Sequence, residues 1–409
     1  MKFTGLNINK NAAQQNKVAE VKEFLNDNYE IRVNEFDPGK SVIRSKTKQY
    51  DNPVTFDDIS LHLLEDGITV SDNILRKILR SPNQVATYNP IEEYFSGLKG
   101  KYKGVSHIDR LMSHLRMREY PGKRNGYYQE RMYRYMKKWF VATAACSLGI
   151  HPNQVAMGLV HSEEGIGKSY FFLDFIVPHQ LRGLIADPKQ DNKFDLEESF
   201  AMNFLVHFDE LTGIHRRNTE LVKKVMTARE IDVYLPREAY PIRRRRIASA
   251  SFTSNKIPEK GGFLTSAMGY RRWLIFELES IDQEYSKKID IDQVWAEALL
   301  LIDQDFDYRW NIDDWNEFKE HNNRYIEETT SMKYVKMFFE HPQNGEGSWL
   351  QPREILNMLV SSRKIRREDI QKVSDVKIGE ALTSLNFRKK SVWKSTEGAR
   401  NCYYVKEIS

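Results

Sequence analysis

The feature that most constrains the fold is a glycine-rich segment between an apolar run and a helical pattern. It spans Ser162–Ser169 (SEEGIGKS) and comes directly after the apolar residues Val155–Val160. Gly165 and Gly167 carry no Cβ, so backbone amides in such a loop can converge on phosphate oxygens. The segment therefore predicts a phosphate-binding loop between a strand and a helix, in an α/β fold.

Each residue type of this loop has a chemical role toward a nucleotide. Lys168 would reach the β- and γ-phosphates, and the hydroxyl of Ser169 would bind Mg²⁺. The helix that begins at Ser169 would add the positive end of its dipole. We therefore expect ATP and Mg²⁺ as ligands. The expected nucleotide-binding residues are Glu164, Gly165, Ile166, Gly167, Lys168, Ser169 and Tyr170.

The loop departs from the usual pattern at its first position, where Ser162 replaces glycine. This weakens the match but does not refute it, because serine can also make such a turn. The alternative is an ordinary strand-to-helix turn without a ligand, since short motifs also occur by accident.

A second apolar run, Phe204–Phe208, ends in the two carboxylates Asp209 and Glu210. Such a buried strand is typical of a Walker B element. Asp209 would hold the metal through water, and Glu210 would polarise the attacking water. The spacing from the glycine-rich loop is typical of an ATPase. The alternative is a strand that happens to end in an acidic turn.

Two further elements fit an ATPase. An apolar run ends at Asn255, where AAA-type ATPases place a polar sensor of the γ-phosphate, although asparagine is also a common turn former. Arg271 and Arg272 follow Gly269, and one of them could be an arginine finger that enters a neighbouring subunit's site. The alternative is a solvent-facing pair before a strand.

Apolar runs alternate with helical patterns in the middle of the chain, which predicts a sheet with parallel strands. The expected strands are Val155–His161, Phe204–Phe208, Ile247–Thr253 and Arg272–Leu278, and the expected helices include Gln129–Leu148, Ser169–Ile176, Thr219–Thr227 and Ile291–Asp303. We expect an N-terminal, mostly helical α+β region at 1–85, a helical lead-in at 86–150, the P-loop ATPase domain at 151–310 and a linker helix at 311–330. Within the first region, 37–53 reads as an exposed loop.

The C-terminal residues 331–409 read as a winged-helix domain. Three helical patterns come first, and two strand-like runs, Phe387–Trp393 and Asn401–Ile408, follow them. The third helix would face the DNA major groove, and the basic hairpin would be the wing. The alternative is a winged helix that contacts protein. The side chains expected to meet DNA phosphates here are Lys377, Lys389, Lys390 and Lys394.

Composition limits the class of protein. The net charge of +5 permits a nucleic-acid partner without demanding one. No apolar run approaches the roughly 18 residues that cross a bilayer, and the N-terminus lacks the apolar core of a signal peptide. Two cysteines, Cys146 and Cys402, suggest neither a disulfide framework nor a zinc site. We therefore expect a cytoplasmic protein without a membrane partner.

In their order and spacing, these motifs resemble the virulence-associated E family, which are ATPases of phages and mobile elements related to superfamily 3 helicases. The resemblance runs from Tyr88–Pro90, through the glycine-rich loop and the acidic pair, to Thr253–Asn255 and Gly269–Arg272. It implies an AAA-like P-loop core of the superfamily 3 type. It also implies an ATP-driven DNA helicase or translocase in replication, a homo-oligomeric ring expected to be a hexamer, and a possible primase or initiator partner.

The resemblance also gives a role to Ile231–Arg246, whose two β-rich runs predict a hairpin. In superfamily 3 ATPases a hairpin here projects into the central channel and grips DNA. Arg237 near the tip and the run Arg243–Arg246 at the base, with Arg243 and Arg244 foremost, would face phosphates. The alternatives are a solvated strand end or ion pairs between subunits.

A competing class is a nucleotide-switched DNA-binding regulator or defence ATPase that does not unwind DNA processively. A small-molecule P-loop kinase fits poorly, because it would need neither a winged helix nor the Gly269–Arg272 segment. The DNA sequence recognised, the direction of translocation and the choice between Arg271 and Arg272 stay open.

Overall fold

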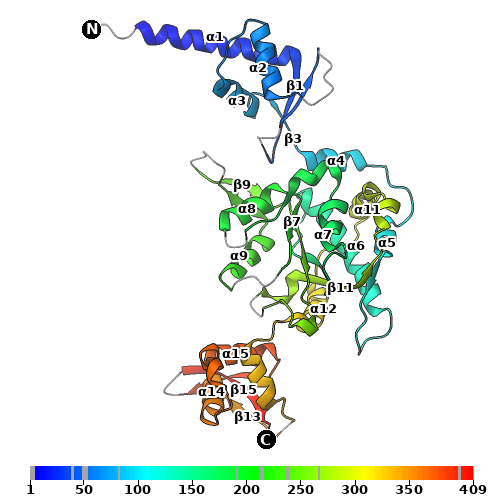
Figure 1. Cartoon of the computed structure of the whole chain (residues 1–409), viewed down its shortest axis with the longest axis vertical. Helices are drawn as coiled ribbons and strands as arrows, with labels where there is room; N and C mark the ends of the chain where they lie inside the picture. Colours follow the sequence, from blue (N-terminus) through cyan, green and yellow to red (C-terminus); the bar gives the residue numbers. More distant parts are fainter. Residues whose placement is uncertain are drawn as a thin grey trace.

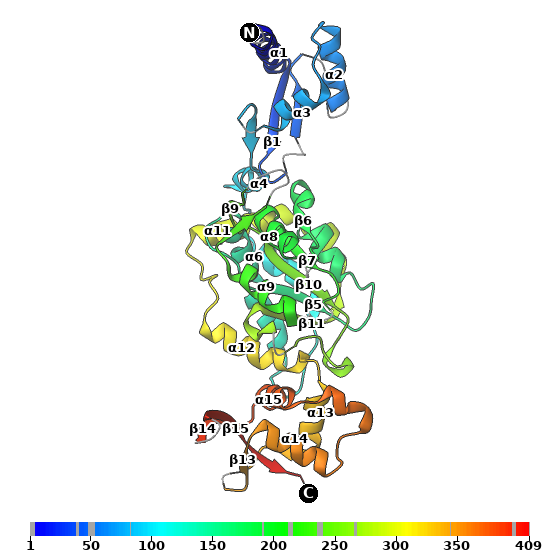
Figure 2. The same cartoon turned by 90° about the vertical axis from the view of Figure 1, so that its left-hand side faces the viewer.

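The computed structural model describes residues 5–37, 41–47, 54–81, 83–189, 192–211, 216–234, 240–265, 268–343, 345–394 and 398–408. They form three units, each with its own cluster of buried apolar side chains. The units follow one another along the long axis of the molecule, and the largest is in the middle (Figures 1 and 2).

The N-terminal unit packs helices on a small sheet with the strand order β2-β1-β3. Ser41–Ser45 forms β2 and pairs antiparallel with β1, so the expected exposed loop over 37–53 is wrong for these residues. Ile43 packs against the core of this unit. The sequence did not reveal this strand, because it is only five residues long and lies between polar neighbours. The elements are α1 (Gly5–Asn28), β1 (Tyr29–Asn34), β2, α2 (Phe56–Glu65), α3 (Asp72–Arg80) and β3 (Ala86–Tyr88).

The central unit is built on a six-stranded sheet with the order β4-β11-β5-β10-β7-β6. All neighbouring strands are parallel except β4, which is antiparallel to β11. Every residue of β5, β7 and β10 is buried, as expected for parallel strands covered on both faces. The predicted parallel α/β sheet is confirmed. Its strands are β4 (Leu115–Met117), β5 (Ala156–Val160), β6 (Ile185–Ala186), β7 (Leu205–Phe208), β10 (Ser249–Ser254) and β11 (Trp273–Ile281).

Helices cover this sheet, and buried indoles tie two of them to it. Trp139 of α6 donates to the carbonyl of Val155, and Trp295 of α11 donates to that of Ile176. The helix expected at Ser169–Ile176 begins as α7 (Lys168–Tyr170) and continues as a π-helix (Phe171–Phe175). The other helices are α4 (Pro90–Leu98), α5 (His107–Met112), α6 (Tyr127–Ser147), α8 (Lys193–Met202), α9 (Arg216–Thr227), α10 (Tyr285–Lys288), α11 (Ile291–Asp303) and α12 (Ile312–Asn322).

The helix α12 packs closely on the central unit. The side-chain amide of Asn322 donates to the carbonyls of Tyr270 and Trp273, and Lys138 of α6 forms a buried ion pair with Asp314. These contacts fix the one-turn helix η5 (Tyr270–Arg272) against α12.

Two short antiparallel strands form a separate sheet, β8 (Glu230–Val233) and β9 (Ile242–Arg245). An antiparallel pair of strands in this segment is confirmed, but the second strand is Ile242–Arg245, whereas the second β-rich run of the sequence was Ala239–Ile242. Arg237, at the expected tip, lies outside the described residues.

The C-terminal unit contains three helices and an antiparallel sheet in which β15 pairs with β12, β13 and β14. The predicted three helices and terminal hairpin are present. The elements are α13 (Thr330–Phe338), β12 (Phe339–Glu340), β13 (Ser348–Leu350), α14 (Pro352–Ser361), α15 (Asp375–Ser384), β14 (Lys389–Lys394) and β15 (Gly398–Glu407).

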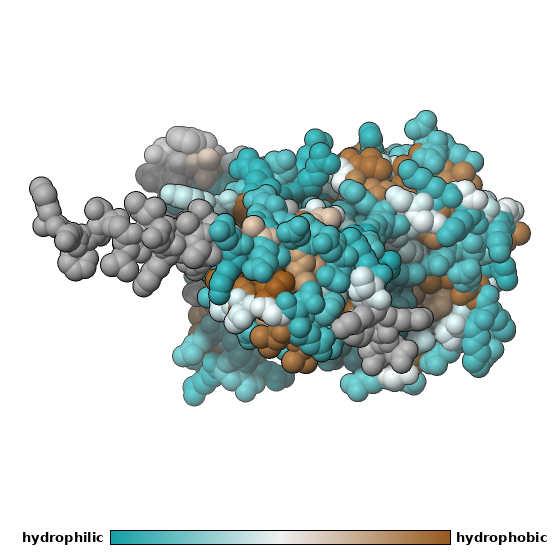
Figure 3. Space-filling view, turned by 90° about the horizontal axis from the view of Figure 1, so that it is seen from above, coloured by the Kyte–Doolittle hydropathy of each residue, from teal (hydrophilic) through white to brown (hydrophobic). Residues whose placement is uncertain are grey.

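Seen from its N-terminal end, the molecule shows mostly hydrophilic side chains, among which apolar ones form small separate patches (Figure 3). Among the helices of the described ranges, none is both long and apolar enough to span a membrane.

Candidate nucleotide-binding site

Three of the motifs singled out in the sequence meet at one edge of the parallel sheet. β10 lies between β5 and β7, with Ser254 opposite Val160 and Phe252 opposite Phe208. Because the three strands are parallel, the segments that follow them emerge side by side. The glycine-rich loop, the acidic pair and Asn255 therefore share the carboxyl edge, where α/β sheets bind ligands.

The backbone of the loop explains its glycines. Gly165 (φ 76°) and Gly167 (φ 100°) are in the left-handed region, which glycine adopts without strain. Ser162 is not among the described residues with a positive φ, so this position does not need glycine. Its carbonyl accepts a hydrogen bond from Lys260 at 3.1 Å. The replacement of the usual glycine by Ser162 is therefore compatible with the loop geometry.

Lys168 is buried at the start of α7, and its ammonium folds back on the loop. It donates to the carbonyls of Glu163 at 2.7 Å and His161 at 3.3 Å. Burial lowers the pKa of Lys168, against the opposing attraction of nearby carboxylates. Charged phosphate oxygens are stronger acceptors than these neutral carbonyls, so an incoming polyphosphate can replace them.

Ser169 and Asp209 place two oxygen ligands next to each other. The Ser169 hydroxyl donates to Oδ1 of Asp209 at 2.9 Å, and Thr253 donates to the same oxygen at 2.8 Å. Burial would raise the pKa of Asp209, but the hydrogen bonds from Thr253 and Ser169 outweigh it and lower this pKa. The pair fits Mg²⁺, which prefers hard oxygen ligands and keeps several waters or phosphate oxygens. The described residues contain no group of three or more His, Cys, Asp or Glu side chains arranged for a metal, so Mg²⁺ would need such additional ligands.

Glu210 and Asn255 contact each other across the edge. Asn255 donates from its side-chain nitrogen to Oε1 of Glu210 at 3.1 Å. Glu210 has a left-handed backbone (φ 48°), and its amide donates to the Thr253 hydroxyl at 3.1 Å. The side-chain oxygen of Asn255 is buried without a hydrogen-bond partner. This unsatisfied acceptor and the strained glutamate are features of a site that a ligand completes.

Three residues of the site were missed from the sequence. Thr253 links the two acidic residues through its hydroxyl. His207, buried below Asp209, contacts the Ser251 hydroxyl at 2.8 Å, and burial lowers its pKa to about 4. Gln283, beyond β11, donates to the carbonyl of Ile166 at 3.4 Å. A Thr two residues before Asn255 was a usable signal, whereas strand pairing alone reveals the other two.

The remaining predicted nucleotide residues lie on the outer side of the loop. Glu164 and Tyr170 are exposed, and Ile166 is half-buried. In the part of the chain that the structure describes, none of the three forms a hydrogen bond or ion pair with the side chains of Asp209 or Glu210.

Arg271 and Arg272 lie at the opposite edge of the sheet. Trp273, the next residue, pairs with Ala156 at the start of β5, whereas the glycine-rich loop follows Val160 at its end. Four strand residues of about 3.3 Å each, or roughly 13 Å, separate the two edges. The structure therefore does not bring either arginine to its own chain's nucleotide loop.

The predicted DNA-contacting arginines differ in their surroundings. Arg243 pairs with Asp232 across the hairpin at 3.1 Å, and Arg244 donates to the carbonyl of Glu35 at 3.3 Å. Arg246, the last of the arginine run, is buried and donates to three carbonyls, those of Ala228, Ala248 and Asn153. The expectation that 246 faces phosphates is therefore wrong, because its guanidinium holds the core together.

The predicted lysines of the C-terminal unit lie on α15 and β14. Lys377 donates to the carbonyl of Lys372 at 2.8 Å. Lys389 and Lys390 lie over the rings of Tyr403 and Trp349. Lys394 ends β14, and its side chain is outside the described residues.

The fold and the site together define a mixed α/β protein with a glycine-rich loop, an acidic pair and a polar residue at one edge of a parallel sheet. The family model of the virulence-associated protein E-like domain matches residues 98–327, more than half of the chain, and the chain belongs to this family.

No curated protein matches the sequence. Among solved structures, the chain is similar to the apo A form of the NrS-1 C-terminal region. The identity is 11%, the alignment covers 95% of this chain and 99% of that one, and the TM-score is 0.43. It is also similar to the JCV helicase at 13% identity, over 61% of this chain and 71% of that one, with a TM-score of 0.29.

Proposed function

We propose that this chain is an ATP-driven DNA helicase or translocase of the superfamily 3 type, which acts in replication of a phage or mobile genetic element. The observation that carries the proposal is the convergence of Lys168, the Ser169–Asp209 pair and the Glu210–Asn255 pair at one sheet edge. These are the groups that binding and hydrolysis of ATP require. The match to the virulence-associated protein E-like domain supports the same proposal.

ATP binding would begin with an exchange of hydrogen bonds at Lys168. Its ammonium leaves the carbonyls of His161 and Glu163 for the β- and γ-phosphates. Ser169 and Asp209 would hold Mg²⁺, which neutralises phosphate charge when it is bound. The amides around Gly165 and Gly167 would complete the cradle.

The hydrolytic water would be positioned by Glu210. Its carboxylate now accepts a hydrogen bond from Asn255, which also has a free acceptor oxygen. When Asn255 turns its amide nitrogen to the γ-phosphate, Glu210 becomes free to accept a proton from the water. In this way Asn255 would free the Glu210 carboxylate for catalysis only when the γ-phosphate is present.

An arginine from a second copy would complete the site. Arg271 and Arg272 lie at the sheet edge opposite their own glycine-rich loop, which supports a role toward a neighbour's nucleotide and not their own. The assembly that this requires is a homo-oligomeric ring, for which we propose a hexamer. In this proposal the predicted lead-in region (86–150), ATPase domain (151–310) and linker helix (311–330) act as one unit, because β4 and α12 pack with the central sheet.

DNA would contact the β8–β9 hairpin and the C-terminal unit. Phe194 and Tyr234 form an exposed aromatic pair beside the hairpin, with ring centroids 5.1 Å apart. Tyr240, two residues before β9, is 80% exposed. Exposed aromatic rings next to basic strands favour single-stranded DNA, because bases stack on them while arginines meet phosphates. The C-terminal unit would act as a winged helix, with α15 toward DNA and β14–β15 as the wing.

The test is ATP hydrolysis with and without single-stranded DNA, for the wild type and for Lys168→Ala and Glu210→Gln. We expect DNA to raise the rate and both variants to abolish it, and we expect the wild type to displace a strand from a forked duplex. Absence of hydrolysis in the wild type, with DNA and Mg²⁺ present, would contradict the proposal.

The second candidate is a nucleotide-switched DNA-binding regulator or defence ATPase. The Glu210–Asn255 contact also suits a switch, because a γ-phosphate that bound Asn255 would break this hydrogen bond. Nucleotide-dependent DNA binding with slow turnover and no strand displacement would favour this function.

A further inference from the structure

The turn that follows β11 lies against the glycine-rich loop. The side-chain nitrogen of Gln283 donates to the carbonyl of Ile166 at 3.4 Å, and a Cβ on Gly167 would lie 3.3 Å from this nitrogen. The Gln283 side chain therefore lies along the loop, directly before the start of α7. It is exposed, and among the hydrogen bonds of the described residues its Oε1 accepts none.

Contacts on both sides of Gln283 fix this turn. The amide of Asp282 donates to the carbonyl of His114 at 2.8 Å, and Oδ2 of Asp282 lies 2.7 Å from Nδ1 of His114. The other oxygen of this carboxylate accepts a hydrogen bond from the amide of Glu284 at 3.1 Å. Tyr285 is fully buried, and its ring packs against the π-helix that continues α7. The position of Gln283 relative to the loop is therefore preorganised, which reduces the entropy lost when a ligand binds.

The strand order decides on which side of the loop the base of a bound nucleotide lies. The loop follows β5, which has β10 on one side and β11 on the other. Asp209, Glu210 and Asn255 follow β7 and β10, so Mg²⁺ and the γ-phosphate would bind on that side. The base and the γ-phosphate are at opposite ends of ATP. With the phosphates at Lys168, the base therefore lies on the β11 side, next to Gln283.

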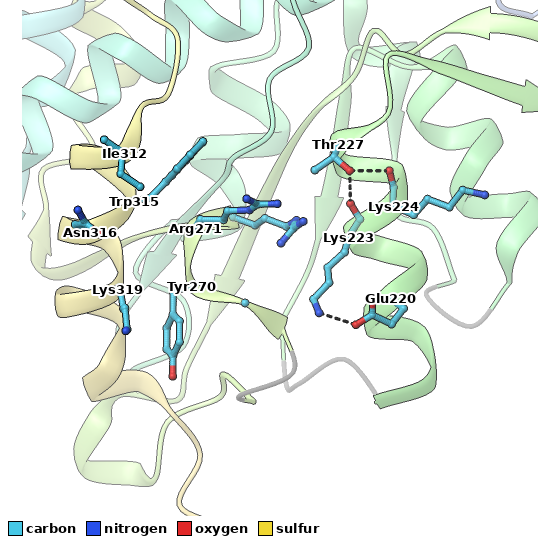
Figure 4. A pocket seen from close by; sticks show the side chains of 12 residues that line it. Glu220, Lys223, Lys224, Thr227, Tyr270, Arg271, Ile312, Trp315, Asn316 and Lys319 are labelled. Carbon is cyan, nitrogen blue, oxygen red and sulfur yellow. Dashed lines mark hydrogen bonds and ion pairs between the residues drawn. The ribbon is translucent and has the colours of Figure 1, made fainter. Parts of the chain in front are cut away.

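A cleft of about 700 Å³ between α9, η5 and α12 does not compete for this base. Arg271 lies in the cleft, between α12 and α9 (Figure 4). It is at the opposite edge of the sheet, and roughly 13 Å of strand separates it from the glycine-rich loop. Because the sheet lies between them, a base whose phosphates are bound in the loop does not reach this cleft.

The amide of Gln283 matches adenine in the orientation that the structure gives it. Its nitrogen donates to the Ile166 carbonyl, so an exchange of amide nitrogen and oxygen would place two acceptor oxygens together. The second hydrogen of this nitrogen can donate to a ring nitrogen of adenine, and Oε1 can accept from the 6-amino group. Guanine has a carbonyl oxygen in place of this amino group, which would meet Oε1 as a second acceptor.

Tyr170 provides an aromatic ring on the same side of the loop. It follows Ser169 directly and is 46% exposed. Burial raises the pKa of Tyr285, and the electrostatic effect of Tyr170 raises it further, so the two hydroxyls lie near each other. An exposed ring stacks on every base and does not distinguish among them. Tyr170 therefore suits the face of a base, and Gln283 suits its polar edge.

We propose that Gln283 binds the edge of the adenine base and that Tyr170 stacks on its face, so that the chain selects ATP over GTP. This inference rests on the proposed function and adds base specificity to it. The glycine-rich loop contacts phosphates, which ATP and GTP share, so the selection needs a group outside the loop.

The test measures nucleotide binding by competition, which does not depend on hydrolysis. ATP, GTP and purine riboside triphosphate, which lacks the 6-amino group of ATP, each displace a nucleotide labelled on its ribose from the full-length protein with Mg²⁺. The wild type should bind ATP at least about 10-fold more tightly than the other two. Gln283→Ala should weaken ATP binding about 10-fold and leave the Kd for GTP within about twofold, so that the preference is lost.

Two further variants separate the edge of the base from its face. Gln371→Ala, which removes an exposed glutamine of the C-terminal unit, is the matched control and should keep the preference for ATP. Tyr170→Ala should weaken the binding of ATP and GTP by the same factor, whereas Tyr170→Phe keeps the ring and should leave both Kd values unchanged.

Equal affinities of the wild type for ATP and GTP, or a preference for ATP that survives Gln283→Ala, would overturn the inference. Hydrolysis by the wild type would still uphold the proposed function in that case. A wild type that selects ATP through Gln283 but hydrolyses neither nucleotide would remove the proposed function and retain the base site. No binding of any of the three nucleotides would overturn both.

Discussion

The side-chain nitrogen of Asn255 lies 3.1 Å from the carboxylate of Glu210 and donates a hydrogen bond to it. The two residues come from the ends of neighbouring parallel strands, β10 and β7. Glu210 is also held by its amide, which donates to Thr253. In this state the Glu210 carboxylate is engaged by Asn255, so in the proposed mechanism the position of the Asn255 amide decides whether this carboxylate can accept a proton from water.

We predict that Asn255→Ala lowers kcat roughly 100-fold, the usual loss for one preorganised donor. The Kd for ATP should change little, because Lys168 and the loop carry the binding. Steady-state hydrolysis and titration with a fluorescent nucleotide measure the two quantities. A kcat equal to that of the wild type would show that the Asn255 contact has no part in hydrolysis.

The backbone at the start of the loop predicts a neutral substitution. Ser162 does not adopt a positive φ, so Ser162→Gly should leave kcat/KM within about twofold of the wild type. Gly167→Ala is the contrasting change. Its Cβ would be in a left-handed conformation and 3.3 Å from the Gln283 amide nitrogen, so strain of about 1–3 kcal/mol should weaken ATP binding. A large increase of kcat/KM in Ser162→Gly would contradict this prediction and show that the serine impairs the function of the loop.

The space around two glycines predicts that their replacement by alanine changes the stability of the protein in opposite directions. A Cβ on Gly158 of β5 would lie 2.0 Å from the Phe252 ring, so Gly158→Ala should lower the free energy of unfolding by about 1–3 kcal/mol. Gly97 in α4 has no atom within 4 Å of such a Cβ, and Gly97→Ala should raise this free energy by about 0.5–1 kcal/mol. Urea unfolding followed by tryptophan fluorescence compares them. Equal midpoints would contradict the packing argument.

His207 predicts a pH dependence of stability. Burial lowers its pKa from 6.5 to about 4, so the folded state keeps the imidazole neutral while the unfolded chain protonates it. The contribution of neutral His207 to the free energy of unfolding is therefore fully present above pH 6.5, and it is lost as the pH falls from 6.5 toward 4. Between pH 7 and pH 5 the free energy of unfolding should fall by about 2 kcal/mol through His207.

His207→Gln is the matched variant, because it keeps a polar side chain next to Ser251 but does not titrate. Urea unfolding at pH 7 and pH 5 should show a smaller difference in the variant than in the wild type. Other buried histidines, such as His321, are common to both proteins and cancel in the comparison. Identical pH differences would show that His207 is not the group responsible.

The sequence revealed those parts of the candidate nucleotide site that each lie within one continuous segment. Gly165, Lys168 and Asp209 follow from local patterns, since an apolar run, a glycine and a charged residue in order are enough to recognise them. The strand order that places β10 between β5 and β7 does not follow from any such pattern. Hence the Asn255–Glu210 contact and the double role of Thr253 became visible only in the structure.

Long-range packing also accounts for the misjudged segments. Ser41–Ser45 is a strand because β1 is next to it, and five residues give too little periodicity to show this. Arg246 belongs to a visible basic run, but its guanidinium is buried because three carbonyls from separate segments surround it. Charge alone does not show whether an arginine faces solvent or the core.

The two edges of the central sheet have a consequence for stoichiometry in the proposed assembly. Each chain carries one nucleotide loop and, roughly 13 Å of strand away, one arginine turn. If the nucleotide loop of one chain meets the arginine turn of the next, the two chains contact each other head to tail through different surfaces. Such heterologous interfaces either close into rings or continue as filaments. An open row of such chains would leave one unused loop and one unused turn at its ends. Only in a closed ring does every chain supply its arginine turn to one neighbour and receive the arginine turn of the other neighbour at its nucleotide loop.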